Sequence, residues 1–166
     1  MAWWDSYRAV YGAELRAAAR EYADHGWPVV DTGEVLQLRT GGRLDILEVS
    51  ATIGRAVCVR LRSAGEVVPV AATPTNRWWF PVAGGARVPA ELRDEVVLHT
   101  GGTTVLAPPS EVQDGWVHWC VPPAQCGYRI PDADLLLTVI ADAIASEERE
   151  TTGTQQSGAV AVATRT

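Results

Sequence analysis

Lysine is absent from this chain of 166 residues, whose fourteen basic side chains are all arginine, and methionine and asparagine occur once each. We attribute this bias to a coding sequence rich in G and C rather than to a chemical requirement. No apolar run approaches the roughly 20 residues that a membrane-spanning helix needs. The N-terminus has neither the basic start nor the continuous apolar stretch of a signal peptide. The sequence therefore predicts a cytoplasmic protein.

Cysteine is also scarce. Cys58, Cys120 and Cys126 form an odd and sparse set, which is not the pattern of a disulfide framework. No histidine follows Cys120 and Cys126 at the spacing of a zinc site. Because free cysteine is among the residue types most often buried, we expect three buried, reduced thiols and no metal bound by them.

The net charge of −6 does not favour a general nucleic-acid coat protein, for which a basic domain is expected. The charge is unevenly distributed, however. Residues 39–93 hold eight arginines against four acidic residues, whereas the segments before and after them are net acidic. This middle segment is the candidate surface for a nucleotide, a nucleic acid or another anionic ligand, and solvated, scattered arginines are the alternative.

Residues 1–148 are expected to form one domain, since 47% of the chain is hydrophobic and 20% is charged. The last 18 positions, 149–166, are mostly small and polar residues without periodicity, and they predict a disordered tail.

Hydrophobic periodicity predicts three helices, over residues 5–25, after the N-cap candidate Ser50, and over residues 131–148. The middle helix would bury Ile53, Val57 and Leu61 on one face. Short runs rich in Val, Trp and Thr predict strands near residues 27–30, 43–49, 67–72, 77–82, 95–99, 103–107 and 116–120. The expected fold is therefore α+β, a mixed sheet flanked by helices.

Three segments, in order, resemble the bifunctional DNA primase/polymerase (prim-pol) domain of the archaeo-eukaryotic primase superfamily. A helix ending in Gly26-Trp27-Pro28-Val29 resembles the family's entry helix and first strand. Residues 73–80, with Thr73-Pro74 and Arg77, occupy the place of a Thr-Pro-Ser-Gly-Gly-Arg-His turn. Residues 101–110 resemble a Gly-Gly-x-Val-Val-Ala-Pro-Pro-Ser segment. The resemblance covers residues 18–120 and is strongest to small, stand-alone actinobacterial members with degenerate catalytic motifs.

The resemblance implies a site in which carboxylates hold two Mg²⁺ or Mn²⁺ ions for nucleotidyl transfer. The family's two acids stand at i and i+2 on one strand, which here gives Glu48 and Ser50, so one carboxylate is kept. Asp45 would join Glu48 only if a β-bulge turned it to the same face. The third family acid falls near Val96, and a small slip in alignment would bring Asp94 or Glu95 to its place.

The resemblance also implies a phosphate-binding Arg-His pair, of which Arg77 is kept while Trp78 replaces the histidine. Arg39 and Arg43 would line the same groove. Trp78 and Trp79 could stack on bases or pack in the core, and alternation along a strand predicts that Trp78 packs inward on the same face as Phe80. His99 could stand in for the missing histidine, but a position beside a Gly101-Gly102 hairpin turn is the favoured interpretation.

Three hypotheses follow for the function. The favoured one is a catalytically degenerate prim-pol-fold protein that binds a nucleotide, a nucleic acid or a protein of the replication or regulatory machinery. The second is an active metal-dependent primase/polymerase, in which Glu48 would hold the metal with Asp45, Asp94 or Glu95. The third is a protein-interaction scaffold without a nucleotide site, which would expose several tryptophans.

Overall fold

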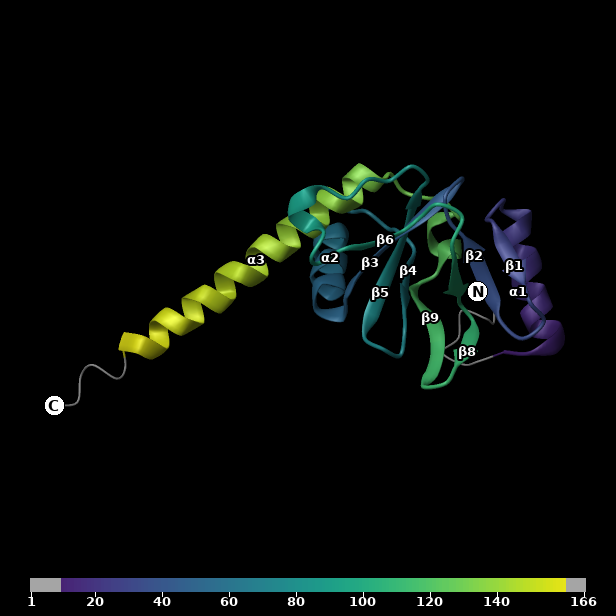
Figure 1. Cartoon of the computed structure of the whole chain (residues 1–166), viewed down its shortest axis with the longest axis horizontal. Coiled ribbons are helices and arrows are strands. Elements are labelled where there is room, and N and C mark those ends of the chain that lie inside the picture. Colours follow the sequence, from purple (N-terminus) through teal and green to yellow (C-terminus); the bar gives the residue numbers. More distant parts are fainter. Residues whose placement is uncertain (1–9, 161–166) are drawn as a thin grey trace.

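In the computed structural model, backbone is described for residues 10–160 and side chains for residues 10–149. Over residues 10–160, three α-helices and nine strands form an α+β fold (Figure 1). In chain order the elements are α1 (Gly12–Asp24), β1 (Val29–Asp31), β2 (Leu36–Arg39), β3 (Leu44–Ser50), α2 (Ala51–Ser63), β4 (Val70–Ala72), β5 (Arg77–Ala83), the 3₁₀ turn η2 (Ala90–Leu92), β6 (Val97–His99), β7 (Thr104–Ala107), β8 (Ser110–Val112), β9 (Gly115–Val121), η3 (Pro123–Cys126) and α3 (Ala133–Val160).

The strands form two sheets, one of three strands in the order β1-β2-β7 and one of six in the order β6-β3-β5-β4-β9-β8. The expectation of a mixed sheet is wrong for the described residues, since every strand pair there is antiparallel. Strand direction could not be read from the connections, because α2 and β4 lie between the paired strands β3 and β5. The sequence also missed the short strands β2 and β8.

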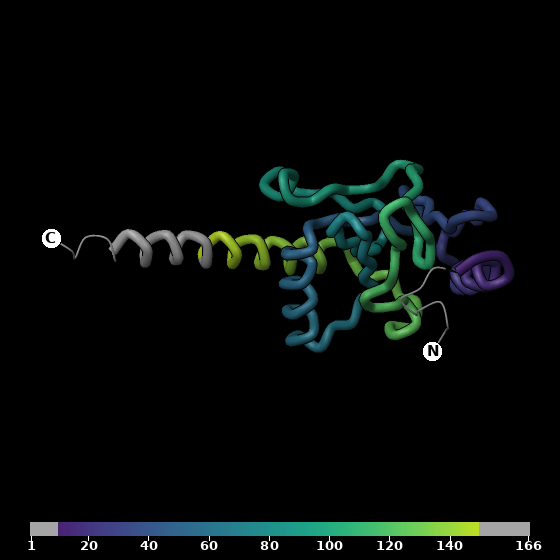
Figure 2. Tube along the Cα trace, turned by 90° about the horizontal axis from the view of Figure 1, so that it is seen from below, coloured from purple at the N-terminus to yellow at the C-terminus, as the bar shows by residue number. Residues whose placement is uncertain are grey.

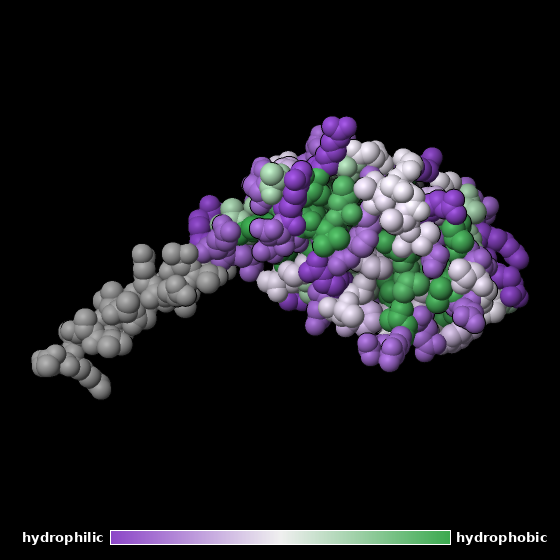
Figure 3. Space-filling view, viewed as in Figure 1, coloured by the Kyte–Doolittle hydropathy of each residue, from purple (hydrophilic) through white to green (hydrophobic). Residues whose placement is uncertain are grey.

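Two apolar clusters cover the two faces of the six-stranded sheet. Along β3, Leu44 and Ile46 face α1 and the small sheet, whereas Leu47 and Val49 face α2 and α3. Figure 2 shows the same sheet from below, with α2 and α3 on one side of it and α1 at the far end. On the face of the molecule drawn in Figure 3, hydrophilic side chains surround small areas of hydrophobic side chains. The alternation along β3 decides which of its polar side chains can meet.

The helices match the sequence expectations best in the middle of the chain. Ser50 caps α2, its hydroxyl accepting a hydrogen bond from the Ile53 amide, and the predicted face of Ile53, Val57 and Leu61 is buried. The first helix begins at Gly12 rather than Asp5, after an extended Tyr11, and the part of the expected helix over residues 5–9 lies outside the described residues.

The third helix differs from expectation at its end. It continues to Val160 instead of ending at Glu148, into the segment expected to be a disordered tail. No proline interrupts the segment, and a helix that is already nucleated extends at one hydrogen bond per residue. Residues 161–166 lie outside the described part.

The three cysteines are free, as expected, but they are half-buried rather than fully buried. Cys58 lies on α2 and Cys120 on β9, and partial burial raises the pKa of both thiols, that of Cys58 to about 11. Both therefore remain neutral near pH 7. Within residues 10–160, no helix is both long and apolar enough to cross a membrane.

Candidate functional site

Glu48 lies on the face of β3 that is turned away from α2 and α3. Its antiparallel neighbours are Trp79 of β5 on one side and Val97 of β6 on the other. Arg77 precedes Trp79 by two residues and therefore projects from the same face of β5. His99 stands two residues beyond Val97 and likewise shares that face. Three strands thus bring one carboxylate, one guanidinium, one indole and one imidazole together.

These side chains form what we call the Glu48 cluster, made of Glu48, Arg77, Trp79 and His99. One oxygen of Glu48, Oε1, accepts a hydrogen bond from Arg77 Nε at 2.7 Å. The other, Oε2, accepts from Trp79 Nε1 at 3.0 Å and lies 2.7 Å from His99 Nε2. Both carboxylate oxygens are therefore already engaged by side chains of the protein.

The cluster strongly favours the ionised form of Glu48. The hydrogen bond with His99 lowers the pKa of Glu48 most. Partial burial raises this pKa, and the hydrogen bonds from Arg77 and Trp79 lower it further, so that it falls to about 2. The side chain of Glu48 is 16% exposed, against 33% for Arg77 and 27% for His99. The carboxylate is thus less exposed than Arg77 and His99, and these two partners are open to a ligand from solvent.

Asp45 does not join the cluster. The pairing of β3 with β5 runs without a bulge, so Asp45 and Glu48 lie on opposite faces. The Asp45 side chain is fully buried, and it accepts hydrogen bonds from the amides of Gly41 at 2.9 Å, Gly85 at 2.8 Å and Ala86 at 3.0 Å. Asp45 therefore anchors two loops to the sheet, one at Gly41 and one at Gly85 and Ala86.

The other expected carboxylates lie elsewhere. Asp94 and Glu95 follow η2 and are exposed, and Glu95 lines a hollow beside the start of α2. Ser50, at the position of the family's second acid, has its hydroxyl engaged in capping α2. Among the described residues, no group of three or more His, Cys, Asp or Glu side chains could hold a metal ion. The residues present do not fit the two-metal centre that the resemblance implies.

Of the three expected phosphate-binding arginines, only Arg77 belongs to the cluster. Arg43 is exposed beside Gly26, where an added Cβ would lie 3.4 Å from its guanidinium carbon. Arg39 is exposed at the end of β2, opposite Thr104. Neither forms a hydrogen bond with the Glu48 cluster within the described structure. The basic segment is therefore spread over several surfaces.

The two neighbouring tryptophans have different roles. Trp78 packs in the α2-facing cluster with Phe80, as alternation predicted, and its indole lies directly under Gly54. Trp79 faces the other way and donates to Glu48. Among the tryptophans that the structure describes, none is exposed: Trp27 and Trp119 are buried, and Trp78, Trp79 and Trp116 are half-buried.

His99 is the residue that sequence reasoning undervalued. The glycine turn after it exists, with φ values of +70° and +85° at Gly101 and Gly102, but it links β6 of the large sheet to β7 of the small one. The expected hairpin is therefore wrong. The signal available in the sequence was the place of His99 just before the glycines, but its contact with Glu48 depends on the pairing of β6 with β3.

Comparison of the chain with protein-family models, with curated proteins and with solved structures gives no match. The prim-pol resemblance accordingly stays a prediction from sequence motifs.

Proposed function

We propose that this chain is a prim-pol-like binding domain that recognises the phosphate of a nucleotide or nucleic acid through Arg77 and His99, without metal-dependent nucleotidyl transfer. The proposal rests on the hydrogen bonds that both carboxylate oxygens of Glu48 make within the protein. In a two-metal mechanism this carboxylate would have to offer its oxygens to cations. Here both oxygens bind donors of the protein instead, which leaves a cluster suited to holding an anion next to the sheet.

The nitrogen atoms that remain available support a phosphate ligand. Arg77 uses Nε for Glu48, and its two terminal nitrogens have no hydrogen bond within the described residues. A guanidinium edge of this kind matches the oxygens of a phosphate. His99 likewise uses Nε2 for Glu48, and its Nδ1 can donate to a phosphate oxygen when the imidazole carries both protons. The Trp79 ring, edge-on to His99 with centroids 6.2 Å apart, supplies an aromatic wall.

Thermal unfolding with ATP, GTP and the four deoxynucleotides, each with and without Mg²⁺ or Mn²⁺, tests the proposal. A ligand that binds only the folded protein stabilises it by about 2.7 kcal/mol at 100 times its Kd. We expect stabilisation that needs no metal, weakens as salt rises and is lost in Arg77→Gln. Arg39→Gln is the matched control, because it removes an exposed arginine outside the cluster and should bind like the wild type.

Two outcomes would contradict the proposal. Stabilisation that requires Mn²⁺ and disappears in Glu48→Gln would instead support the active polymerase, and primer extension would follow as the next assay. No stabilisation by any nucleotide or by short single-stranded DNA would favour a protein partner.

A further inference from the structure

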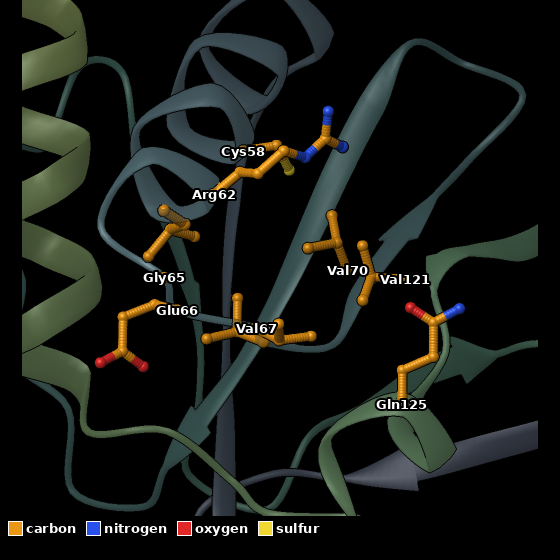
Figure 4. A pocket seen from close by; sticks show the side chains of 10 residues that line it. Cys58, Arg62, Gly65, Glu66, Val67, Val70, Val121 and Gln125 are labelled. Atoms are coloured by element: carbon orange, nitrogen blue, oxygen red, sulfur yellow. The ribbon is translucent and has the colours of Figure 1, made fainter.

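A cavity lies on the opposite side of the large sheet from the Glu48 cluster. Its volume is about 220 Å³, and it opens between the last turns of α2, the start of β4 and the end of β9. Figure 4 shows Cys58 and Arg62 of α2 at one side of it and Val67, Val70 and Val121 at the other. Leu61, Val68 and Val70, which also line it, belong to the apolar cluster beneath α2. We call it the Arg62 pocket.

The wall of the Arg62 pocket is mostly apolar and has room for a small ring or a branched chain. Four valines, at positions 67, 68, 70 and 121, contribute to it together with Leu61. An apolar cavity of about 150 Å³ is enough to hold benzene. The larger volume here therefore admits a ligand of that size that carries one additional polar group.

The charges at the mouth leave one cation without a partner. Arg62 is exposed, and its guanidinium forms no hydrogen bond or ion pair among the described residues. The acidic side chain beside it, Glu66, already faces Arg129, with Oε2 to Nη2 at 3.6 Å. Cys58 adds no thiolate, because burial raises its pKa. Gln125 contributes only a neutral amide to the rim.

We propose that the Arg62 pocket binds a small organic monocarboxylate, with its apolar part against the valines and its carboxylate on Arg62. Two separate features of the pocket determine the ligand. The apolar wall selects an apolar body, and the unpaired guanidinium selects a negative charge. The pocket takes a ligand of a different class from the phosphate proposed for the Glu48 cluster, and the two sites are separated by the sheet.

Titration of the ¹⁵N-labelled full chain with benzoate, followed by NMR, tests the proposal. We expect saturable shifts centred on the amides of Cys58, Arg62 and Val121. Arg62→Gln should weaken benzoate binding by about fivefold, the upper end for an ion pair at an exposed site. Arg55→Gln is the matched control, since it removes an exposed arginine of the same helix that does not line the pocket.

Two further measurements separate shape from charge. Benzamide, which has nearly the same shape and no charge, should bind at least about fivefold more weakly than benzoate. Val67→Phe should abolish binding of both by filling the mouth, and Val67 is already 45% exposed, so the change leaves the core intact. Equal affinity of wild type and Arg62→Gln would overturn the proposal. So would equal binding of benzoate and benzamide, shifts centred on Arg77 and His99, or the absence of saturable shifts.

Discussion

Asp45 and Glu48 lie on the same strand, yet their carboxylates serve opposite faces of the six-stranded sheet. Asp45 accepts hydrogen bonds from three backbone amides, whereas Glu48 is held by three side chains. The first carboxylate is therefore part of the framework, and the second is part of a surface that a ligand can reach. This difference allows the two acids to be tested separately.

Asp45→Asn should destabilise the fold by about 2 kcal/mol. Asn has one acceptor oxygen where Asp has two, so at least one of the amides of Gly41, Gly85 and Ala86 loses its acceptor in a buried place. Urea unfolding measures the loss. The exposed Asp94→Asn is the control and should change the free energy of unfolding by less than about 0.5 kcal/mol. Equal stability of the two variants would contradict the anchoring role of Asp45.

Glu48→Gln should lower stability at neutral pH and matter less in acid. Because the pKa of Glu48 is about 2 in the folded protein against an ordinary 4.5, its ionised form stabilises the fold above pH 4.5. That contribution is lost as the pH falls from 4.5 through 2. We expect it to be about 2 kcal/mol at pH 7, less than the full shift implies, because Arg77 and His99 are partly exposed.

Urea unfolding of the wild type and Glu48→Gln at pH 7 and pH 3 checks this dependence. The gap between the two proteins should be clearly smaller at pH 3. A gap that stays constant between the two pH values would show that the Glu48 carboxylate is not held as the structure has it.

Gly54→Ala should destabilise the protein even though alanine is the better helix former. A Cβ at this position of α2 would lie 2.7 Å from the Trp78 ring, and overpacking of this kind costs about 1–3 kcal/mol. The gain in helix propensity of about 1 kcal/mol offsets only part of it. Thermal unfolding and tryptophan fluorescence report the effect. Gly42→Ala, where the Cβ would meet open space, should be nearly neutral; equal losses would refute the packing argument.

Ser50 should behave as a helix cap. Ser50→Ala removes the acceptor for the Ile53 amide and should cost about 1 kcal/mol. Ser50→Asp should stay within about 0.5 kcal/mol of the wild type, because aspartate also caps helices and Arg77 lies directly opposite in the sheet. Thermal unfolding of the three proteins decides the point. An aspartate variant as unstable as the alanine variant would argue against capping.

Local sequence signals correctly predicted several helices and strands. A single capping serine and a four-residue spacing defined α2, and the bounds of β3 and β5 were predicted to within a residue. The strands β2 and β8 were missed, although β1, β4 and β6, which have only three residues each, were predicted. Strand direction also depends on long-range pairing, which explains the mistaken mixed sheet.

The candidate site likewise contains residues that local motifs indicated and one that long-range strand pairing brings in. Glu48, Arg77 and Trp79 were identified from motifs, but His99 is 51 residues from Glu48 in sequence and meets it only through the register of β6 on β3. The role of Asp45 was hidden for a related reason. Its partners are backbone amides of loops, which have no residue signature in the sequence.

The length of α3 has a consequence for how the protein behaves in solution. Twenty-eight helical residues span about 42 Å at 1.5 Å per residue. Among the side chains that the structure describes, Ile144 is the last of α3 in the apolar cluster, and Glu147 and Glu148 still line a hollow beside the start of α2. The C-terminal part of the α3 backbone extends away from the two sheets (Figure 1). Such a shape increases hydrodynamic drag, so a monomer of 17.8 kDa should elute from a gel-filtration column ahead of compact proteins of equal mass. Sedimentation equilibrium, which depends on mass and not on shape, distinguishes this elongated monomer from a dimer.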